Sequence, residues 1–127
     1  MARRPNEDDK QPSEKALKRV PAAFWRTEKG KEPVREWLKE MSKADRTTIG
    51  EDLAKLEYGW PVGMPLCRAM KDGLWELRSK LRGKRLARIL FTFFEEALVL
   101  LHGFIKKSNK TPKDDLDLAL KRKNTLG

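Results

Sequence analysis

The fold is decided by residues 73–91, which read GLWELRSKLRGKRLARILF. Apolar and polar side chains alternate on both sides of Gly83, which is the pattern of two β-strands joined by a hairpin whose tip is residues 82–84. The first strand is expected to place Trp75, Leu77 and Leu81 on one face and Glu76, Arg78 and Lys80 on the other. The returning strand is expected to place Ala87, Ile89, Phe91 and Phe93 on one face and Leu86, Arg88 and Leu90 on the other.

A hairpin centred on Gly83 places Arg78 opposite Arg88 on the face away from the core. Like charges directly opposite one another destabilise a sheet, so two facing arginines favour an anion held between them. Further basic residues extend this predicted anion site on an open sheet face: Lys80, Arg82, Lys84 and Arg85. The alternative is the ordinary solvated strand face of a basic protein.

Two helices are predicted before the hairpin. Pro33 suits a first helical turn, and an apolar stripe follows it at Val34, Trp37, Leu38 and Met41. Asp45 is a candidate cap for a second helix, which carries Ile49, Leu53 and Leu56 and ends at Gly59. Joined by a short turn, the two form an antiparallel helical hairpin. Residues 22–26, upstream of it, are predicted to be a short strand.

After the hairpin, Glu95 and Glu96 make a turn, and the apolar run 97–101 predicts a central strand covered on both faces. Thr111 and Pro112 then mark the start of a last helix, with Thr111 as its cap. The prediction is therefore an α+β domain over 22–127, with an antiparallel β-sheet, an N-terminal helical hairpin and a C-terminal helix. Residues 1–21 are predicted to be a disordered basic tail.

The charge is concentrated in the second half of the chain. The 127 residues carry a net charge of +10, and residues 66–94 alone hold eight basic and two acidic residues. Such an excess favours a polyanionic partner, with nucleic acid first and a membrane surface second. A lone Cys67 cannot form an internal disulfide, and no apolar run or leader pattern is present, so a cytoplasmic location is expected.

The residues available for chemistry are basic. His102, Lys106 and Lys107 lie at or just past the end of the last predicted strand. The sequence has no phosphate-binding glycine loop, no serine-hydrolase elbow and no metal-ligand spacing. An enzyme of this composition needs a substrate that brings its own nucleophile, as RNA does with its 2′-hydroxyl. No metal and no cofactor are expected, and His102 is either a proton carrier or a structural residue.

The chain resembles the phage-derived HigB-like branch of the RelE/ParE toxin superfamily over residues 22–123. The resemblance rests on these segments: Gly73-Leu74-Trp75-Glu76-Leu77-Arg78, Arg88-Ile89-Leu90-Phe91, Val99-Leu100-Leu101-His102-Gly103-Phe104-Ile105-Lys106-Lys107, and Thr111-Pro112 before a helix with Ala119. It implies a RelE-like fold and the toxin of a type II toxin–antitoxin pair that cleaves mRNA in the ribosomal A site. It also implies a small helix-turn-helix antitoxin as partner.

By position, the resemblance makes Arg78 a basic site residue, Arg88 the phosphate-binding arginine, and Lys106 and Lys107 a basic cluster. On this basis Arg88→Ala is expected to abolish growth arrest and leave the fold intact. RelE has a C-terminal tyrosine that aids cleavage, whereas the sole tyrosine here, Tyr58, ends the second helix. Proton transfer then falls to His102 or a lysine. A non-enzymatic inhibitor of DNA gyrase, as in ParE, and a plain nucleic-acid-binding module are the alternatives.

Overall fold

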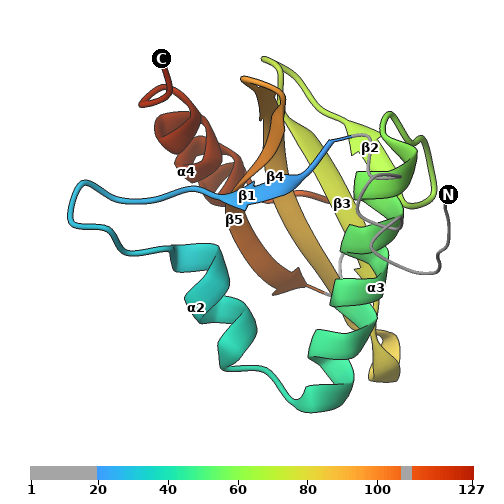
Figure 1. Ribbon diagram of the computed structural model, residues 1–127. Helices are drawn as coiled ribbons and strands as arrows, with labels where there is room; N and C mark the ends of the chain where they lie inside the picture. Colours follow the sequence, from blue (N-terminus) through green and yellow to red (C-terminus); the bar gives the residue numbers. More distant parts are fainter. Residues whose placement is uncertain (1–19, 107–109) are drawn as a thin grey trace, which may run out of the picture.

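The computed structural model describes residues 20–106 and 110–127, which form one five-stranded sheet flanked by helices. In chain order the elements are β1 (Ala22–Phe24), α2 (Pro33–Lys39), α3 (Lys43–Gly59), β2 (Cys67–Ala69), β3 (Trp75–Lys80), the short turn η1 (Arg82–Lys84), β4 (Leu86–Phe94), β5 (Ala97–Lys106) and α4 (Lys113–Lys123). The predicted α+β class is confirmed, and Figure 1 shows the arrangement.

The sheet has the strand order β1-β5-β4-β3-β2. β2, β3, β4 and β5 pair antiparallel, but β1 pairs parallel with β5, so the sheet is mixed and not wholly antiparallel as predicted. No tight turn joins β1 to β5, because α2, α3 and three strands lie between them along the chain. A connection of this length allows the two strands to pair in parallel. Two residues assigned to the tail belong to this junction: Leu98 donates a backbone hydrogen bond to Pro21, and Val20 packs against the core.

Both faces of the sheet are covered. On one face, α2 contacts β5 and α3 contacts β3, around a core that includes Ile49, Leu77 and Phe91. On the other face, α4 packs on β4 and β5 around Leu90 and Leu101 (Figure 1). The expectation that the sheet face carrying Arg88 is open is therefore wrong, because the C-terminal helix and the residues leading into it cover this face.

The helix starts differ from the predicted ones. The N-cap of α3 is Ser42, whose Oγ accepts a hydrogen bond from the Asp45 backbone N–H at 3.2 Å. The N-cap position of α4 is Pro112, with no side-chain capping bond, so Thr111 is not the cap. Both predicted caps lie close to the real ones, and each is diverted because its side chain has a partner elsewhere: Arg85 for Asp45 and Glu76 for Thr111.

The β3–β4 turn follows the sequence pattern closely. Gly83 has φ of +73°, a left-handed conformation that glycine adopts without strain. At the turn between β4 and β5, Glu95 and Glu96 also have positive φ, as a two-residue hairpin turn requires. None of the helices within 20–106 and 110–127 combines the length and apolar character needed to cross a bilayer.

Candidate functional site

The register of the hairpin agrees with the prediction: Arg78 pairs with Arg88, and Arg88 in turn pairs with Phe104 on β5. Parallel rows lie on either side of this one on the face toward α4. One row runs from Lys80 through Leu86 to Lys106, and the other from Glu76 through Leu90 to His102. Basic residues therefore gather at the end of the sheet nearest the β3–β4 turn.

Arg88 does not face an open surface. Its side chain is fully buried, and its Nη1 donates to the carbonyl oxygen of Lys110 at 2.7 Å and to Thr111 Oγ1 at 3.4 Å. Its guanidinium also lies over the Phe104 ring, 5.8 Å from the ring centroid. Burial lowers the pKa of Arg88, although an arginine stays protonated in proteins. The expectation that Arg78 and Arg88 jointly present an exposed anion site is therefore corrected, because the segment before α4 covers Arg88.

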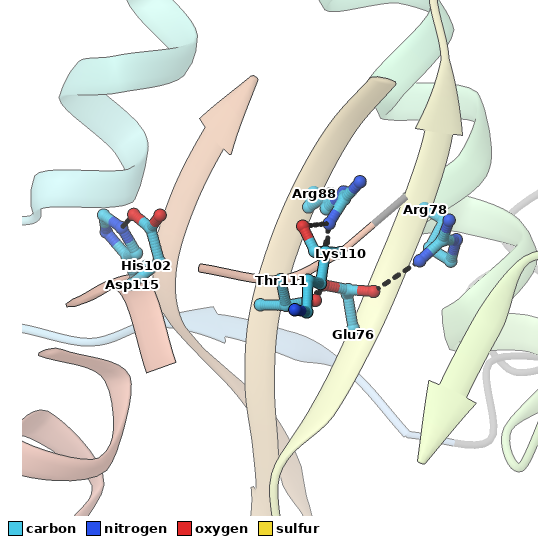
Figure 2. Close-up of polar contacts among 7 residues, drawn as sticks. All are labelled: Glu76, Arg78, Arg88, His102, Lys110, Thr111 and Asp115. Atoms are coloured by element: carbon cyan, nitrogen blue, oxygen red, sulfur yellow. Dashed lines mark hydrogen bonds and ion pairs between the residues drawn. The ribbon is translucent and has the colours of Figure 1, made fainter. Parts of the chain in front are cut away.

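Glu76 is the buried partner of this cluster, whereas the sequence predicts it on the open strand face away from the core. Its carboxylate accepts hydrogen bonds from Arg78 Nη1 at 2.8 Å and from the Thr111 hydroxyl at 2.5 Å, and it lies 3.9 Å from Arg88 Nη1. Figure 2 shows the Glu76 side chain between Thr111 and Arg78, with Arg88 on the neighbouring strand β4. A carboxylate on a strand face that otherwise carries cations was the signal available in the sequence.

A hollow of about 510 Å³ lies beside this cluster, at the end of the β3–β4 hairpin. We call it the basic pocket; it is lined by Arg78, Lys80, Lys84, Arg85, Met64, Pro65, Leu81 and Leu86. Lys80 and Lys84 are exposed, whereas the Arg78 side chain is only 12% exposed. The pocket thus brings together four of the basic residues selected from the sequence. Arg82 lies apart from them, in a separate hollow at the start of α3.

Arg85 is partly neutralised by a partner on α3. Its guanidinium makes a two-pronged contact with Asp45, with Nη1–Oδ2 and Nη2–Oδ1 distances of 2.8 and 3.1 Å. The hydrogen bonds from Arg85 hold the pKa of the Asp45 carboxyl below its usual range. Arg85 therefore fastens the hairpin to α3. Lys80 and Lys84 are the exposed cations of the pocket, and Arg78 lines it while bonded to Glu76.

His102 belongs to a second polar contact. Its Nε2 lies 2.6 Å from Asp115 Oδ1 on α4. Its ring stacks on the ring of Phe104, with 5.5 Å between the two ring centroids. Figure 2 shows this pair apart from the Glu76 cluster, and β4 lies between the strand of His102 and the strand of Glu76. Lys106 is exposed at the end of β5, opposite Leu86, while Lys107 lies outside the described residues. The structure therefore does not bring His102 into the basic pocket.

The candidate site is made of cations, apolar side chains and one buried carboxylate. Within 20–106 and 110–127, no three or more His, Cys, Asp and Glu side chains are grouped so that they could hold a metal ion. Chemically, the arrangement can bind a phosphate, stabilise negative charge and donate protons from ammonium groups.

The comparisons with known proteins give one match, to a family model. No curated protein matches the chain. Residues 36–124 match the family model described as Phage derived protein Gp49-like, a span that runs from α2 through α4 and includes the basic pocket and the Glu76 cluster. Because the match covers well over half of the sequence, the chain belongs to the Gp49-like family of phage-derived proteins, a family of RelE-like, toxin-like proteins.

Proposed function

We propose that this protein is the toxin of a type II toxin–antitoxin pair of the HigB-like kind, and that it stops translation by cleaving mRNA on the ribosome. The observation that carries the proposal is the basic pocket, in which Arg78, Lys80 and Lys84 surround one hollow large enough for a nucleotide. Membership of a toxin-like family supports the same conclusion.

In the proposed reaction the substrate supplies the nucleophile. The 2′-hydroxyl of one nucleotide attacks the adjacent phosphorus, and the bond from phosphorus to the 5′-oxygen of the next nucleotide breaks. The products are a 2′,3′-cyclic phosphate and a 5′-hydroxyl. The 2′-hydroxyl proton passes to solvent, and the leaving 5′-oxygen takes a proton from an ammonium group. The protein has to hold the phosphate, stabilise its added charge and deliver that proton.

Arg78 is the residue we assign to the phosphate. The Glu76 carboxylate fixes one of its nitrogens at 2.8 Å, so the guanidinium is held in place before RNA binds. A donor that is already oriented needs no rearrangement when charge develops, and this makes its stabilisation effective. Lys80 and Lys84, both exposed at the same pocket, are the candidate proton donors.

Arg88 receives a different role from the one implied by the resemblance. Because it is fully buried and bonded to Lys110 and Thr111, it acts through the cluster and not on RNA directly. We therefore place Arg88 with Glu76 and Thr111 as a positioning group for Arg78. We assign Lys106, which is exposed on the same row of the sheet as Lys80, to contact with the RNA backbone beyond the pocket.

The partners follow from the same proposal. A basic ribonuclease that acts on translating ribosomes works in the cytoplasm and needs an antitoxin in its own cell. A small helix-turn-helix protein encoded beside it is the expected antitoxin. The proposed reaction gives no step to a metal, because the phosphate contact and the proton transfer are assigned to Arg78 and the lysines.

The test is induced expression without the neighbouring gene, followed by mapping of mRNA 5′ ends. We expect growth arrest with new ends inside translated codons. Lys80→Ala/Lys84→Ala is expected to lose both, whereas Lys29→Ala/Lys31→Ala, which removes the same charge from the exposed turn before α2, is expected to keep both. Arrest without new ends would contradict cleavage and support gyrase inhibition instead.

A further inference from the structure

The basic pocket has an apolar side that phosphate binding does not explain. Met64 is 63% exposed and, with Leu86, lies outside both hydrophobic cores. Both line the pocket beside Lys80 and Lys84. Single exposed apolar residues are ordinary on protein surfaces. Here, however, the exposed Met64 and the half-buried Leu86 share one hollow with cations. A hollow of this kind suits a ligand with an apolar face and an anionic edge.

A nucleotide has those two parts. Its base is flat and apolar on both faces, and its phosphate carries the negative charge. Methionine is suited to such a contact, because its flexible, polarisable thioether packs favourably against aromatic rings. The volume of about 510 Å³ is within the range of about 300–1,000 Å³ typical of small-molecule sites.

We infer that the basic pocket is a nucleobase subsite, in which one unpaired RNA base lies against Met64 and Leu86 while its flanking phosphates contact Lys80 and Lys84. This inference rests on the proposed function, since it names the part of the RNA that the site recognises. A base stacked in a duplex cannot enter the pocket, so the subsite selects single-stranded RNA.

The test compares two labelled hexamers in fluorescence anisotropy at one salt concentration: hexauridylate, and a ribose-phosphate hexamer of equal charge that lacks bases. We expect the unmodified protein to bind hexauridylate about tenfold more tightly, because a base that packs against protein adds affinity that phosphates do not. Met64→Ala and Leu86→Ala are each expected to weaken hexauridylate binding about threefold to fivefold, as partial loss of that contact predicts. Neither is expected to change the binding of the abasic hexamer.

Phe93→Ala is the matched control. Phe93 is the other large apolar side chain that is exposed in the described part of the chain, at 46%, and it lies near the opposite end of β4 from Leu86. We expect the Phe93→Ala variant to bind both hexamers with the same affinity as the unmodified protein. Thermal melting of each variant checks its fold, and since Met64 and Leu86 lie outside both cores, their variants are expected to melt near the unmodified protein.

Equal affinity for the two hexamers would overturn the subsite. If Lys80→Ala/Lys84→Ala weakened both hexamers equally in that case, the proposed RNA cleavage would stand with a site that reads phosphates alone. Absence of binding to either hexamer would also overturn the subsite, and cleavage on the ribosome would then decide the proposed function separately. Unchanged RNA binding by Met64→Ala together with weakened neutralisation by the antitoxin would assign the apolar side to a protein contact.

Discussion

The Glu76 carboxylate and the Arg88 guanidinium lie 3.9 Å apart inside the protein, and neither side chain is exposed to solvent. Arg78 shares the same carboxylate, so one negative charge serves two positive ones. The Nε and Nη2 atoms of Arg88 have no hydrogen-bond partner among residues 20–106 and 110–127. The cluster therefore depends on Glu76, and the consequences of removing each member differ.

Glu76→Gln is expected to lower the free energy of unfolding by about 3–5 kcal/mol, because it leaves two guanidinium groups without their shared counter-charge. Urea denaturation followed by circular dichroism measures the change. Asp117→Asn is the control, because Asp117 pairs with Lys113 on the exposed side of α4 and its loss is expected to have little effect. A Glu76→Gln protein as stable as the unmodified one would show that the cluster is not coupled as described.

Arg88→Ala is expected to destabilise the fold more than Arg78→Ala does. Arg88 is fully buried and holds the residues leading into α4, whereas the Arg78 side chain reaches the pocket. This replaces the expectation that Arg88→Ala leaves the fold intact. Thermal melting of the two variants makes the comparison. Equal melting temperatures, or a lower one for Arg78→Ala, would contradict the separate roles given to the two arginines.

Asp45→Asn is expected to reduce stability at neutral pH and to have no effect in strong acid. The pKa of Asp45 is lower in the folded protein than in the unfolded chain, chiefly through the hydrogen bonds from Arg85. Its contribution is therefore present above the unfolded value of about 3.9 and is lost as the pH falls through the lower folded value.

Denaturation at pH 7 and near pH 2 measures this difference for Asp45. Arg85→Gln is expected to behave in the same way as Asp45→Asn, and the double variant to add nothing beyond either single change. A difference from the unmodified protein that persisted unchanged near pH 2 would show that the contact contributes through packing and not through charge.

His102→Gln is expected to leave growth arrest in place and to lower stability by about 1 kcal/mol, the value of an ordinary side-chain hydrogen bond. The reason is that His102 is bonded to Asp115 and lies beyond Arg88 from the basic pocket. Growth after induction, together with denaturation, tests both parts. Loss of growth arrest in a well-folded His102→Gln protein would contradict this structural role and indicate that His102 transfers a proton.

The hairpin and most of the core were predictable because they depend on local patterns. Alternation around Gly83 gives the β3–β4 register correctly, including Arg78 opposite Arg88. The spacing of apolar residues likewise places the helices that flank the sheet. These features depend on neighbours along the chain, so a single sequence contains enough information to find them.

The burial of Glu76 and Arg88 was not predictable in the same way. Both are charged residues on a strand face, a pattern that usually indicates a face exposed to solvent. They are buried because Thr111, more than twenty residues farther along the chain than Arg88, covers them. A contact that depends on where a distant segment packs leaves no periodic signal, and for the same reason the parallel pairing of β1 was missed.

Primer extension on mRNA in a reconstituted translation reaction tests the central claim most directly. With purified ribosomes, the unmodified protein is expected to produce new 5′ ends within the codon at the ribosomal A site. Lys80→Ala/Lys84→Ala is expected to produce none, and Lys29→Ala/Lys31→Ala is expected to produce the same ends as the unmodified protein. Cleavage by the Lys80→Ala/Lys84→Ala protein at the unmodified rate, or no cleavage by any of the three, would contradict the proposal that the basic pocket cuts mRNA.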